Sequence, residues 1–174
     1  MGQAAGSDWP AEVYRRMQEL DISILAIVPD AGLTRLLELC KADAAMTVVT
    51  LSTEEEGVGL CFGAWAGGKR ALLCMQSSGT GNCINALGLP AFTKTPCLML
   101  VTMRGQAGEA NPAQVAMGSA VAKVFRAMGV EVAEAQASQE VGVLFGEAAE
   151  KAYDQGRAAA LLVSQQVIGV KTFE

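Results

Sequence analysis

Apolar residues in this chain occur in short uninterrupted runs, and the segments between these runs carry apolar residues at helical spacing. Short apolar runs bounded by turn residues are typical of β-strands, while apolar positions three or four residues apart are typical of amphipathic helices. The pattern predicts strands at 22–28, 46–51, 71–76, 97–103, 130–132 and 159–164. It predicts helices at 10–20, 33–41, 54–67, 80–92, 116–128 and 140–155, and a polar loop at 104–114.

The predicted strands are apolar throughout instead of alternating, which is expected where helices cover both faces of a sheet. We therefore expect an α/β fold, a doubly wound and mostly parallel sheet flanked by helices. With 174 residues, 51% of them hydrophobic, the chain is long enough for one core, and we expect one domain over 1–174. Ligands bind such sheets beyond the carboxyl ends of the strands, so we look for the function in the loops at 29–32, 52–56, 77–82 and 104–114.

Charge and cysteine content narrow the class of function. The net charge is −5 and Lys and Arg do not cluster, which argues against a nucleic-acid or acidic-membrane surface. The chain shows neither a secretory signal pattern nor an apolar run of membrane-spanning length. Its five cysteines have no metal-ligand spacing and are expected to be buried, reduced thiols. We expect a cytoplasmic protein that acts on a small molecule and binds no metal through its own residues.

Three consecutive glutamates, Glu54 to Glu56, begin one predicted helix. A structural interpretation is available, in which Ser52 caps the helix, Glu55 completes a capping box and the acidic charges favour the helix dipole. The helix that follows is apolar on all sides from 57 to 66 and rich in Gly and Ala. A helix without a polar face is buried all round. One side can lie on its own sheet, and the other side is then expected to contact a second subunit.

The segment 76–82, Gln-Ser-Ser-Gly-Thr-Gly-Asn, lies between a predicted strand and a predicted helix. Glycines in this position allow a tight turn and the close approach of a ligand, and N–H groups at a helix start bind anions or polar ring atoms. The segment lacks the third glycine of a dinucleotide fingerprint and the Gly-Lys-Ser/Thr of a P-loop. A structural turn capped by Thr80 or Asn82 is an equally good interpretation of this segment alone.

The order of these motifs is more specific than each motif alone. An acidic helix start, a small-residue helix, Gly67-Gly68-Lys69, a strand, Ser-Gly-x-Gly, a helix and Thr95-Pro96 before a strand resemble the pyrimidine-binding (PYR) domain of thiamine-diphosphate enzymes. The stretches EEEGVGLCFGAWAGGK, MQSSGTGNCINALGLP, VTMRG and NPAQVAMG are most similar to the α subunits of the sulfopyruvate decarboxylase family. The phosphonopyruvate decarboxylases are similar too. The resemblance runs from the Val-Pro-Asp at 28–30 to about Met128.

The resemblance implies a catalytic role for one glutamate, which hydrogen-bonds N1′ of the aminopyrimidine. Counting back from Gly63 selects Glu54, and a shift of one residue would select Glu55. The capping interpretation also favours Glu54, because a capping box would occupy Glu55. The resemblance further assigns a set of residues to cofactor binding: Pro29, Asp30, Gln76, Ser78, Gly79, Thr80 and Asn82. For Asp30, a helix cap and a polar wall of the site are both possible roles, and the match of Val-Pro-Asp favours the second.

For the substrate, Arg104 follows a predicted strand, and its planar guanidinium suits a sulfonate, phosphonate or carboxylate. Asn111 and Gln114 could add neutral hydrogen-bond donors. The alternative for Arg104 is a surface ion pair with Glu109, which its spacing favours equally. On the first interpretation, we expect 3-sulfopyruvate to be preferred over phosphonopyruvate and pyruvate, with sulfoacetaldehyde and carbon dioxide as products.

Two departures from the family pattern point to a partner. The chain has no Gly-Asp-Gly…Asn motif, which holds Mg²⁺ and diphosphate in this superfamily, and it has no histidine. The resemblance therefore implies a β subunit that supplies the diphosphate-binding domain and Mg²⁺, in an α2β2 or larger assembly. A different hypothesis is a non-catalytic nucleotide-binding α/β module that uses Ser78 to Gly81 for a phosphate. That module explains the glycine segment but not the apolar helix, and it predicts that the isolated chain binds nucleotides.

Overall fold

Six parallel strands form one sheet, in the order β2-β1-β3-β4-β6-β5, in the computed structural model, which describes residues 7–169. The strands are β1 (Ile22–Ile27), β2 (Thr47–Thr50), β3 (Arg70–Gln76), β4 (Cys97–Thr102), β5 (Glu131–Ala135) and β6 (Ala158–Val163). The main helices are α1 (Trp9–Glu19), α2 (Thr34–Ala42), α3 (Glu54–Ala66), α4 (Gly88–Thr93), α5 (Val115–Ala127), α6 (Ser138–Tyr153) and α7 (Gln165–Ile168). Three 3₁₀ segments complete the fold: η1 (Ala31–Leu33), η2 (Ser77–Cys83) and η3 (Pro112–Gln114).

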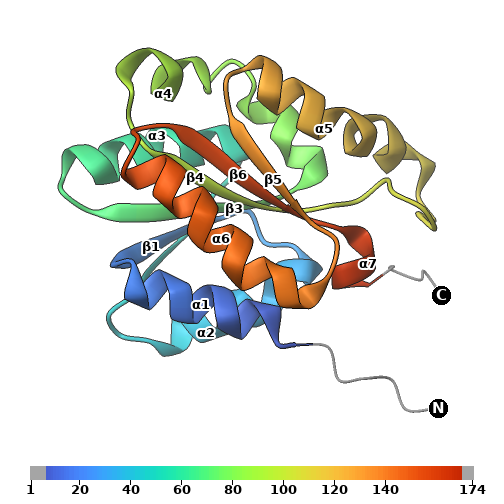
Figure 1. The fold of residues 1–174 in the computed structure, drawn as a ribbon, viewed down its shortest axis with the longest axis horizontal. Helices are drawn as coiled ribbons and strands as arrows, with labels where there is room; N and C mark the ends of the chain where they lie inside the picture. Colours follow the sequence, from blue (N-terminus) through green and yellow to red (C-terminus); the bar gives the residue numbers. More distant parts are fainter. Residues whose placement is uncertain (1–6, 170–174) are drawn as a thin grey trace.

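Helices cover both faces of the sheet, as the apolar strands predict. Helices α1, α2 and α6 lie on one face, and α3, α4 and α5 lie on the other (Figure 1). Each layer has its own buried core, with Phe145 of α6 in one and Phe125 of α5 in the other. The central strands β4 and β6 are buried at every residue. The prediction of a doubly wound parallel sheet is confirmed, because strands buried on both faces leave no polar side.

Helix α3 lies close to the sheet, and glycine makes this possible. A Cβ atom at Gly57 would lie 2.2 Å from a methyl group of Leu73 on β3. The buried residues of α3 are Glu54, Gly57, Val58 and Cys61. On its outward side Gly59 and Gly63 face open space and Ala66 is exposed, whereas Trp65 lies one turn after the buried Cys61 and stacks on Tyr153. The sheet therefore covers one side of this apolar helix, and its outward side remains exposed in the single chain.

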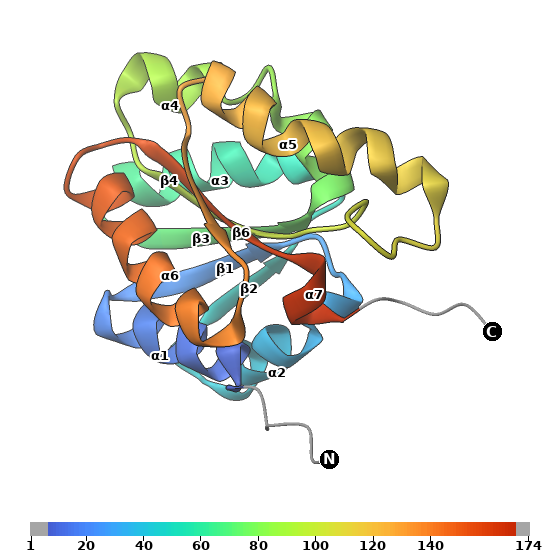
Figure 2. The ribbon, with the colours of Figure 1, turned by 45° about the vertical axis from the view of Figure 1, so that its right-hand side comes forward.

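The structure departs from the predicted elements at two places. The predicted helix 80–92 is replaced by the 3₁₀ segment η2, a turn and the short helix α4. Helix α7, which follows β6 directly, is absent from the prediction. It lies at the carboxyl ends of the strands, beside the segment that follows β1 (Figure 2).

All five cysteines are buried free thiols, as the sequence predicts. Burial raises the pKa of Cys40 and the pKa of Cys83 to about 12. Thiols with such raised pKa values are poor nucleophiles and poor metal ligands at neutral pH. The cysteines therefore act as small apolar side chains of the two cores.

Candidate active site

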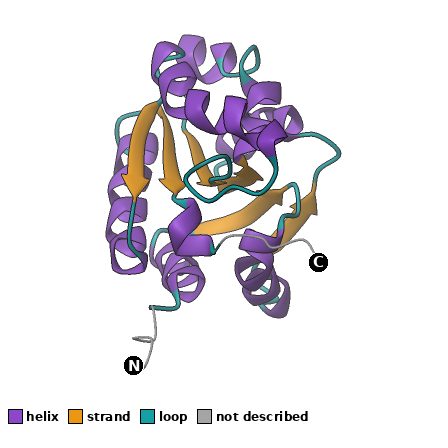
Figure 3. Ribbon diagram, turned by 90° about the vertical axis from the view of Figure 1, so that its right-hand side faces the viewer, coloured by secondary structure: helices purple, strands orange, loops and turns teal. Residues whose placement is uncertain are grey.

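The loops that carry the candidate residues meet at one edge of the sheet, where the parallel strands end. Figure 3 views the molecule from the side that is on the right in Figure 1, and because β1, β3 and β4 are neighbouring parallel strands, the segments that follow them leave the sheet at the same edge. The direction in which successive strands are added to the sheet reverses between β1 and β3, because β2 lies outside β1 on one side and β4 lies outside β3 on the other. Such a switch point places a crevice beyond the strand ends. The start of α3 lies next to it, since α3 contacts η2.

Glu54 is the first residue of α3 and its side chain turns inward, so that the residue is only 8% exposed. Its Oε2 accepts a hydrogen bond of 2.7 Å from Asn82 Nδ2. Its Oε1 lies against the backbone of Gly79, where a Cβ atom would be 2.0 Å away. Glycine at 79 is therefore required for this contact. The Glu54 carboxylate is thus held in place by the Asn82 amide, and its oxygen atoms can accept further hydrogen bonds.

The capping-box interpretation is wrong. The helix begins after Thr53, one residue later than it assumes, and Thr53 makes no side-chain capping bond. Glu56 consequently occupies the third helical position, and its Oε2 accepts from the backbone N–H of Ser52 at 2.9 Å. Glu55 is exposed to solvent. The capping argument therefore gives no support to the choice of Glu54 over Glu55, but Glu54 is the glutamate that faces η2.

Segment η2 differs from the predicted helix start because its side chains bond elsewhere. Thr80 is buried and its hydroxyl donates to the carbonyl oxygen of Ser77 at 2.6 Å. Asn82 donates to Glu54. Neither residue caps a helix, so the predicted cap is contradicted, although the bond of Thr80 to Ser77 does stabilise the turn. Long 3₁₀ segments are uncommon, and this one follows the path that brings Gly79 against Glu54.

Asp30 caps a helical segment, one of the two roles that the sequence leaves open, and its carboxylate makes further hydrogen bonds at the strand ends. Its Oδ2 accepts from the backbone N–H of Gly32 at 3.1 Å, which caps η1. Its side chain also accepts from Gln76 Nε2 at 2.8 Å and from the Thr102 hydroxyl at 3.1 Å. Gln76 in turn accepts from the Ser78 hydroxyl at 2.8 Å. These bonds tie the ends of β1, β3 and β4 together, while Pro29 beside them is exposed.

The expected free guanidinium at Arg104 is contradicted by the structure. Arg104 forms two hydrogen bonds to Glu109, of 2.6 Å from Nε and 2.5 Å from an NH2 group. The pair is buried and not at the surface, with side chains 4% and 1% exposed. The hydrogen bond from Arg104 is the largest influence on the Glu109 carboxyl, whose pKa is far below its usual range.

The other two predicted substrate residues lie in the same loop. Asn111 caps η3, because its side chain accepts from the backbone N–H of Ala113 at 3.1 Å. The Oε1 atom of Gln114 is buried without a hydrogen-bond partner. Gln165, at the start of α7, donates to Glu109 at 2.9 Å. The sequence gives no signal for Gln165, since nothing in it indicates that the end of β6 lies beside this loop.

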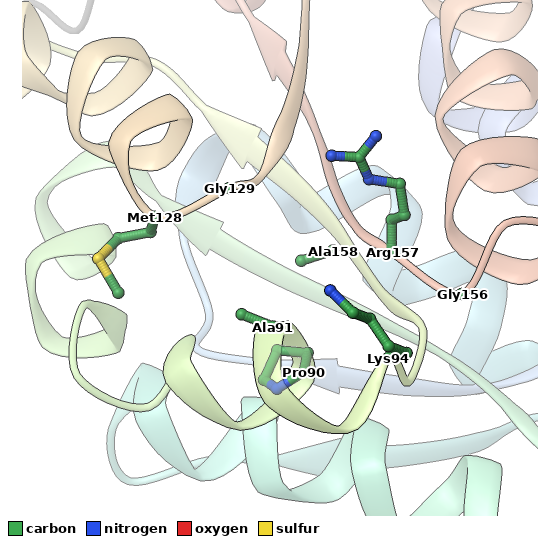
Figure 4. A pocket seen from close by; sticks show the side chains of 8 residues that line it. All are labelled: Pro90, Ala91, Lys94, Met128, Gly129, Gly156, Arg157 and Ala158. Carbon is green, nitrogen blue, oxygen red and sulfur yellow. The ribbon is translucent and has the colours of Figure 1, made fainter.

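A pocket of about 130 Å³ lies at the opposite edge of the sheet (Figure 4). The side chains of Lys94 and Arg157 border it, and Arg157 bonds Glu131 at 2.7 Å. The pocket lies where α4, α5 and α6 end, because Lys94, Gly129 and Gly156 follow these helices. Positive charges at helix C-termini are stabilised by the helix dipole. The pocket is therefore explained by the fold and lacks the site residues.

Over residues 7–169, no group of three or more His, Cys, Asp or Glu side chains is arranged to hold a metal ion. In the same range no helix combines the length and the apolarity needed to cross a bilayer.

No protein-family model matches the chain. It is 34% identical to the sulfopyruvate decarboxylase subunit alpha of Methanothermobacter thermautotrophicus over 152 residues, which cover 87% of this chain and 92% of the relative. It is 31% identical to the subunit of the same name from Methanococcus maripaludis, with 87% and 91% covered. A phosphonopyruvate decarboxylase of Streptomyces viridochromogenes is 31% identical over 105 residues, 60% of this chain and 26% of that protein.

Among solved structures, the fold is similar to that of a 2-oxoglutarate:ferredoxin oxidoreductase from Magnetococcus marinus. The TM-score is 0.71 at 14% sequence identity, over 90% of this chain. The chain spans 28% of the length of that larger protein. At this identity the similarity concerns the fold alone, which agrees with the predicted PYR-type arrangement.

Proposed function

This chain belongs to the family of sulfopyruvate decarboxylase α subunits, and we propose that it is the pyrimidine-binding subunit of a thiamine-diphosphate-dependent 2-oxoacid decarboxylase. The proposed reaction converts 3-sulfopyruvate to sulfoacetaldehyde and carbon dioxide, a carboxy-lyase reaction. The α subunits of two archaea support the substrate through their names and their near full-length match. The phosphonopyruvate decarboxylase match is shorter and supports a related distal anion.

One observation carries the proposal: the buried Glu54 carboxylate, bonded to Asn82 and lying against Gly79. The missing side chain at the buried Gly79 admits the Glu54 carboxylate, which keeps spare acceptor capacity for a ligand. These groups fit an aminopyrimidine ring, which offers polar nitrogen atoms and a flat face. The proposal also assigns Asp30, Gln76 and Ser78, which follow β1 and β3 and are joined by hydrogen bonds, to the cofactor side of the site, with Pro29 and Thr80 beside them in the chain.

Each of these residues has a part in the proposed mechanism. Thiamine diphosphate, when bound, supplies the electron sink that decarboxylation needs. Glu54 holds a proton at N1′ of the pyrimidine, while Asn82 fixes the carboxylate in the orientation that this requires. Gly79 leaves room for the Glu54 carboxylate, and the Asp30–Gln76–Ser78 hydrogen bonds keep the strand ends rigid. Rigid support of this kind matters because catalysis depends on accurate placement of the reacting groups.

The proposal includes a partner subunit, as the word alpha in the names of the relatives implies. The chain has no Gly-Asp-Gly…Asn motif and no histidine. We therefore assign the diphosphate, its Mg²⁺ ion and any histidine acid or base to a β subunit, in an α2β2 or larger assembly. The outward side of α3, with Gly59, Gly63 and Ala66, supplies an apolar surface of the kind that a subunit interface buries.

The direct test is reconstitution. The full chain is mixed with a β subunit that carries Gly-Asp-Gly…Asn, thiamine diphosphate and Mg²⁺, and carbon dioxide release from 3-sulfopyruvate is measured. We expect turnover by the mixture and neither turnover nor tight cofactor binding by either subunit alone. Phosphonopyruvate and pyruvate are run in parallel to define the preferred acid. Turnover and micromolar cofactor binding by this chain alone would refute the two-subunit function.

A further inference from the structure

The loop 104–114 folds back on itself and is closed at its base. Gly105, with φ of +76°, lies against Gln114, so that a Cβ atom there would be 2.2 Å from the Gln114 carbonyl oxygen. A Cβ atom at Gly118 of α5 would be 2.1 Å from the Arg104 carbonyl oxygen. A loop of this length with its two ends in contact is an Ω-loop, a class whose interior is filled by its own side chains and which is frequently functional.

Glu109 fills the interior of this loop. It accepts both bonds from Arg104, one from the backbone N–H of Gly105 at 3.0 Å and one from the backbone N–H of Asn111 at 2.9 Å. A fifth bond, of 2.9 Å, comes from Gln165 Nε2 outside the loop. One carboxylate thus joins the start of the loop, its far side and the end of β6. Its side chain is 1% exposed.

Gln165 also connects the loop to α7 through a reciprocal pair of hydrogen bonds with Gln106, in which each backbone N–H donates to the side chain of the other residue. The N–H of Gln106 donates to Gln165 Oε1 at 3.1 Å, and the N–H of Gln165 donates to Gln106 Oε1 at 2.7 Å. The loop is therefore attached to the end of β6 by three hydrogen bonds, including that of Glu109. Motion of Glu109 has to be accompanied by motion of these contacts.

The pairing leaves Arg104 poorly suited to bind a substrate anion. A sulfonate would have to displace Glu109 from a two-bond, charge-assisted contact, which is the strong geometry for a guanidinium. The displaced carboxylate would remain buried beside the incoming anion, and like charges in a buried site repel strongly. Asn111 and Gln114, which the loop presents, are neutral.

We propose that Arg104 and Glu109 form a clasp that positions the loop 104–114 over the active-site edge, so that Arg104 acts on the substrate only through the loop. Glu109 is thereby a positioning residue of the decarboxylase. Two experiments test this inference. The first, called the substrate arm, measures kinetics with different acids and rests on the proposed function. The second, called the loop arm, measures hydrogen exchange and concerns the chain alone.

The substrate arm compares Arg104→Ala, Glu109→Gln and the double variant in the reconstituted complex. We expect each variant to lower kcat/KM for 3-sulfopyruvate and for pyruvate by the same factor, about 10²-fold, since small misplacements have effects of this size. The double variant should be no worse than either single one, because the two residues act as a unit. Arg126→Ala removes a matched exposed ion pair with Glu134 and should leave both rates unchanged.

A loss in Arg104→Ala that is at least about tenfold larger for 3-sulfopyruvate than for pyruvate would overturn the proposal, because it would place the sulfonate on the guanidinium. Unchanged kcat/KM in both single variants would overturn it as well. A clasp of purely structural importance would lower the amount of folded complex without changing kcat/KM per folded molecule.

The loop arm uses hydrogen exchange on the purified full-length chain. Amides of 104–114 and of α7 should exchange about tenfold faster or more in Glu109→Gln and Arg104→Ala, while those of β4 and α3 keep their wild-type rates. Equal exchange of the loop in wild type and Glu109→Gln would overturn the clasp. Faster exchange throughout the chain would overturn it too. If the complex decarboxylates no oxoacid, the proposed function fails, and exchange still decides the clasp.

Discussion

The start of helix α3 and the loop 104–114 each bury a glutamate at the same edge of the sheet, but the two carboxylates have opposite surroundings. Glu109 accepts five hydrogen bonds, two of them from a guanidinium. Among the described residues, Glu54 accepts one hydrogen bond, from a neutral amide, and faces a bare glycine. A saturated carboxylate holds structure together, whereas a partly satisfied one is available to a ligand. Burial alone therefore does not distinguish a structural carboxylate from one that is available to a ligand.

The largest expected effect is on turnover, at Glu54. Glu54→Gln keeps the shape of the side chain but cannot share a proton in the same way, and we expect a loss of about 10² to 10⁴-fold in kcat. Assembly with the β subunit and the melting temperature should stay near wild type. Glu55→Gln is the matched control, because Glu55 is exposed one residue away. Normal turnover in Glu54→Gln with loss in Glu55→Gln would transfer the role to Glu55.

For the free energy of unfolding, we expect the larger effect at Glu109 and the smaller one at Glu54. Glu109→Ala leaves the Arg104 guanidinium buried without its partner, which costs about 3–5 kcal/mol in the free energy of unfolding. Glu54→Ala removes one hydrogen bond to an exposed amide and should cost about 1 kcal/mol. Urea unfolding of both variants measures the difference. Equal losses would remove the contrast between a structural and a functional carboxylate.

The contact between Glu54 and Gly79 can be tested by adding one methyl group. Gly79→Ala places a Cβ atom 2.0 Å from Glu54 Oε1, and relief of that overlap has to move the carboxylate. We expect a destabilisation of about 1–3 kcal/mol together with a clear loss of turnover. Gly81→Ala is the control, since its Cβ atom would meet only Met117 Sδ at 3.5 Å. Similar behaviour of the two variants would show that the segment rearranges freely.

The smallest expected effect concerns pH. Hydrogen bonding to Arg104 holds the pKa of Glu109 below its usual value of 4.5 in the folded chain. Its contribution to stability is therefore fully present above about pH 4.5 and is lost as the pH falls toward the folded-state pKa. The difference in unfolding free energy between wild type and Glu109→Gln should accordingly shrink from pH 7 to pH 3. A difference that stays constant over this range would contradict the assigned ionic pair.

Most of the fold is readable from the sequence because it depends on local periodicity and burial. The fully apolar runs predict each strand to within a few residues, and their lack of alternation predicts helices on both faces. Helix α3 and its acidic start are predicted at their observed place. The helix predicted at 80–92 is wrong in its first part, where the structure has the 3₁₀ segment η2. Gly79 and Asn82 of this segment contact Glu54, which lies 28 residues away from Asn82 in the chain. Local propensity contains no information about that contact.

For the site, the sequence by itself determined the family resemblance, and from it the prediction of the site loops and of Glu54, because the resemblance follows from residue types in a fixed order. Tertiary structure alone decided which charges are already satisfied. The spacing of Arg104 and Glu109 permits both an exposed pair and a free guanidinium, and only the closed loop and Gln165 from the end of β6 make the pair buried and saturated. The energy of a charge depends on its desolvation and on all of its partners, and distant segments supply both.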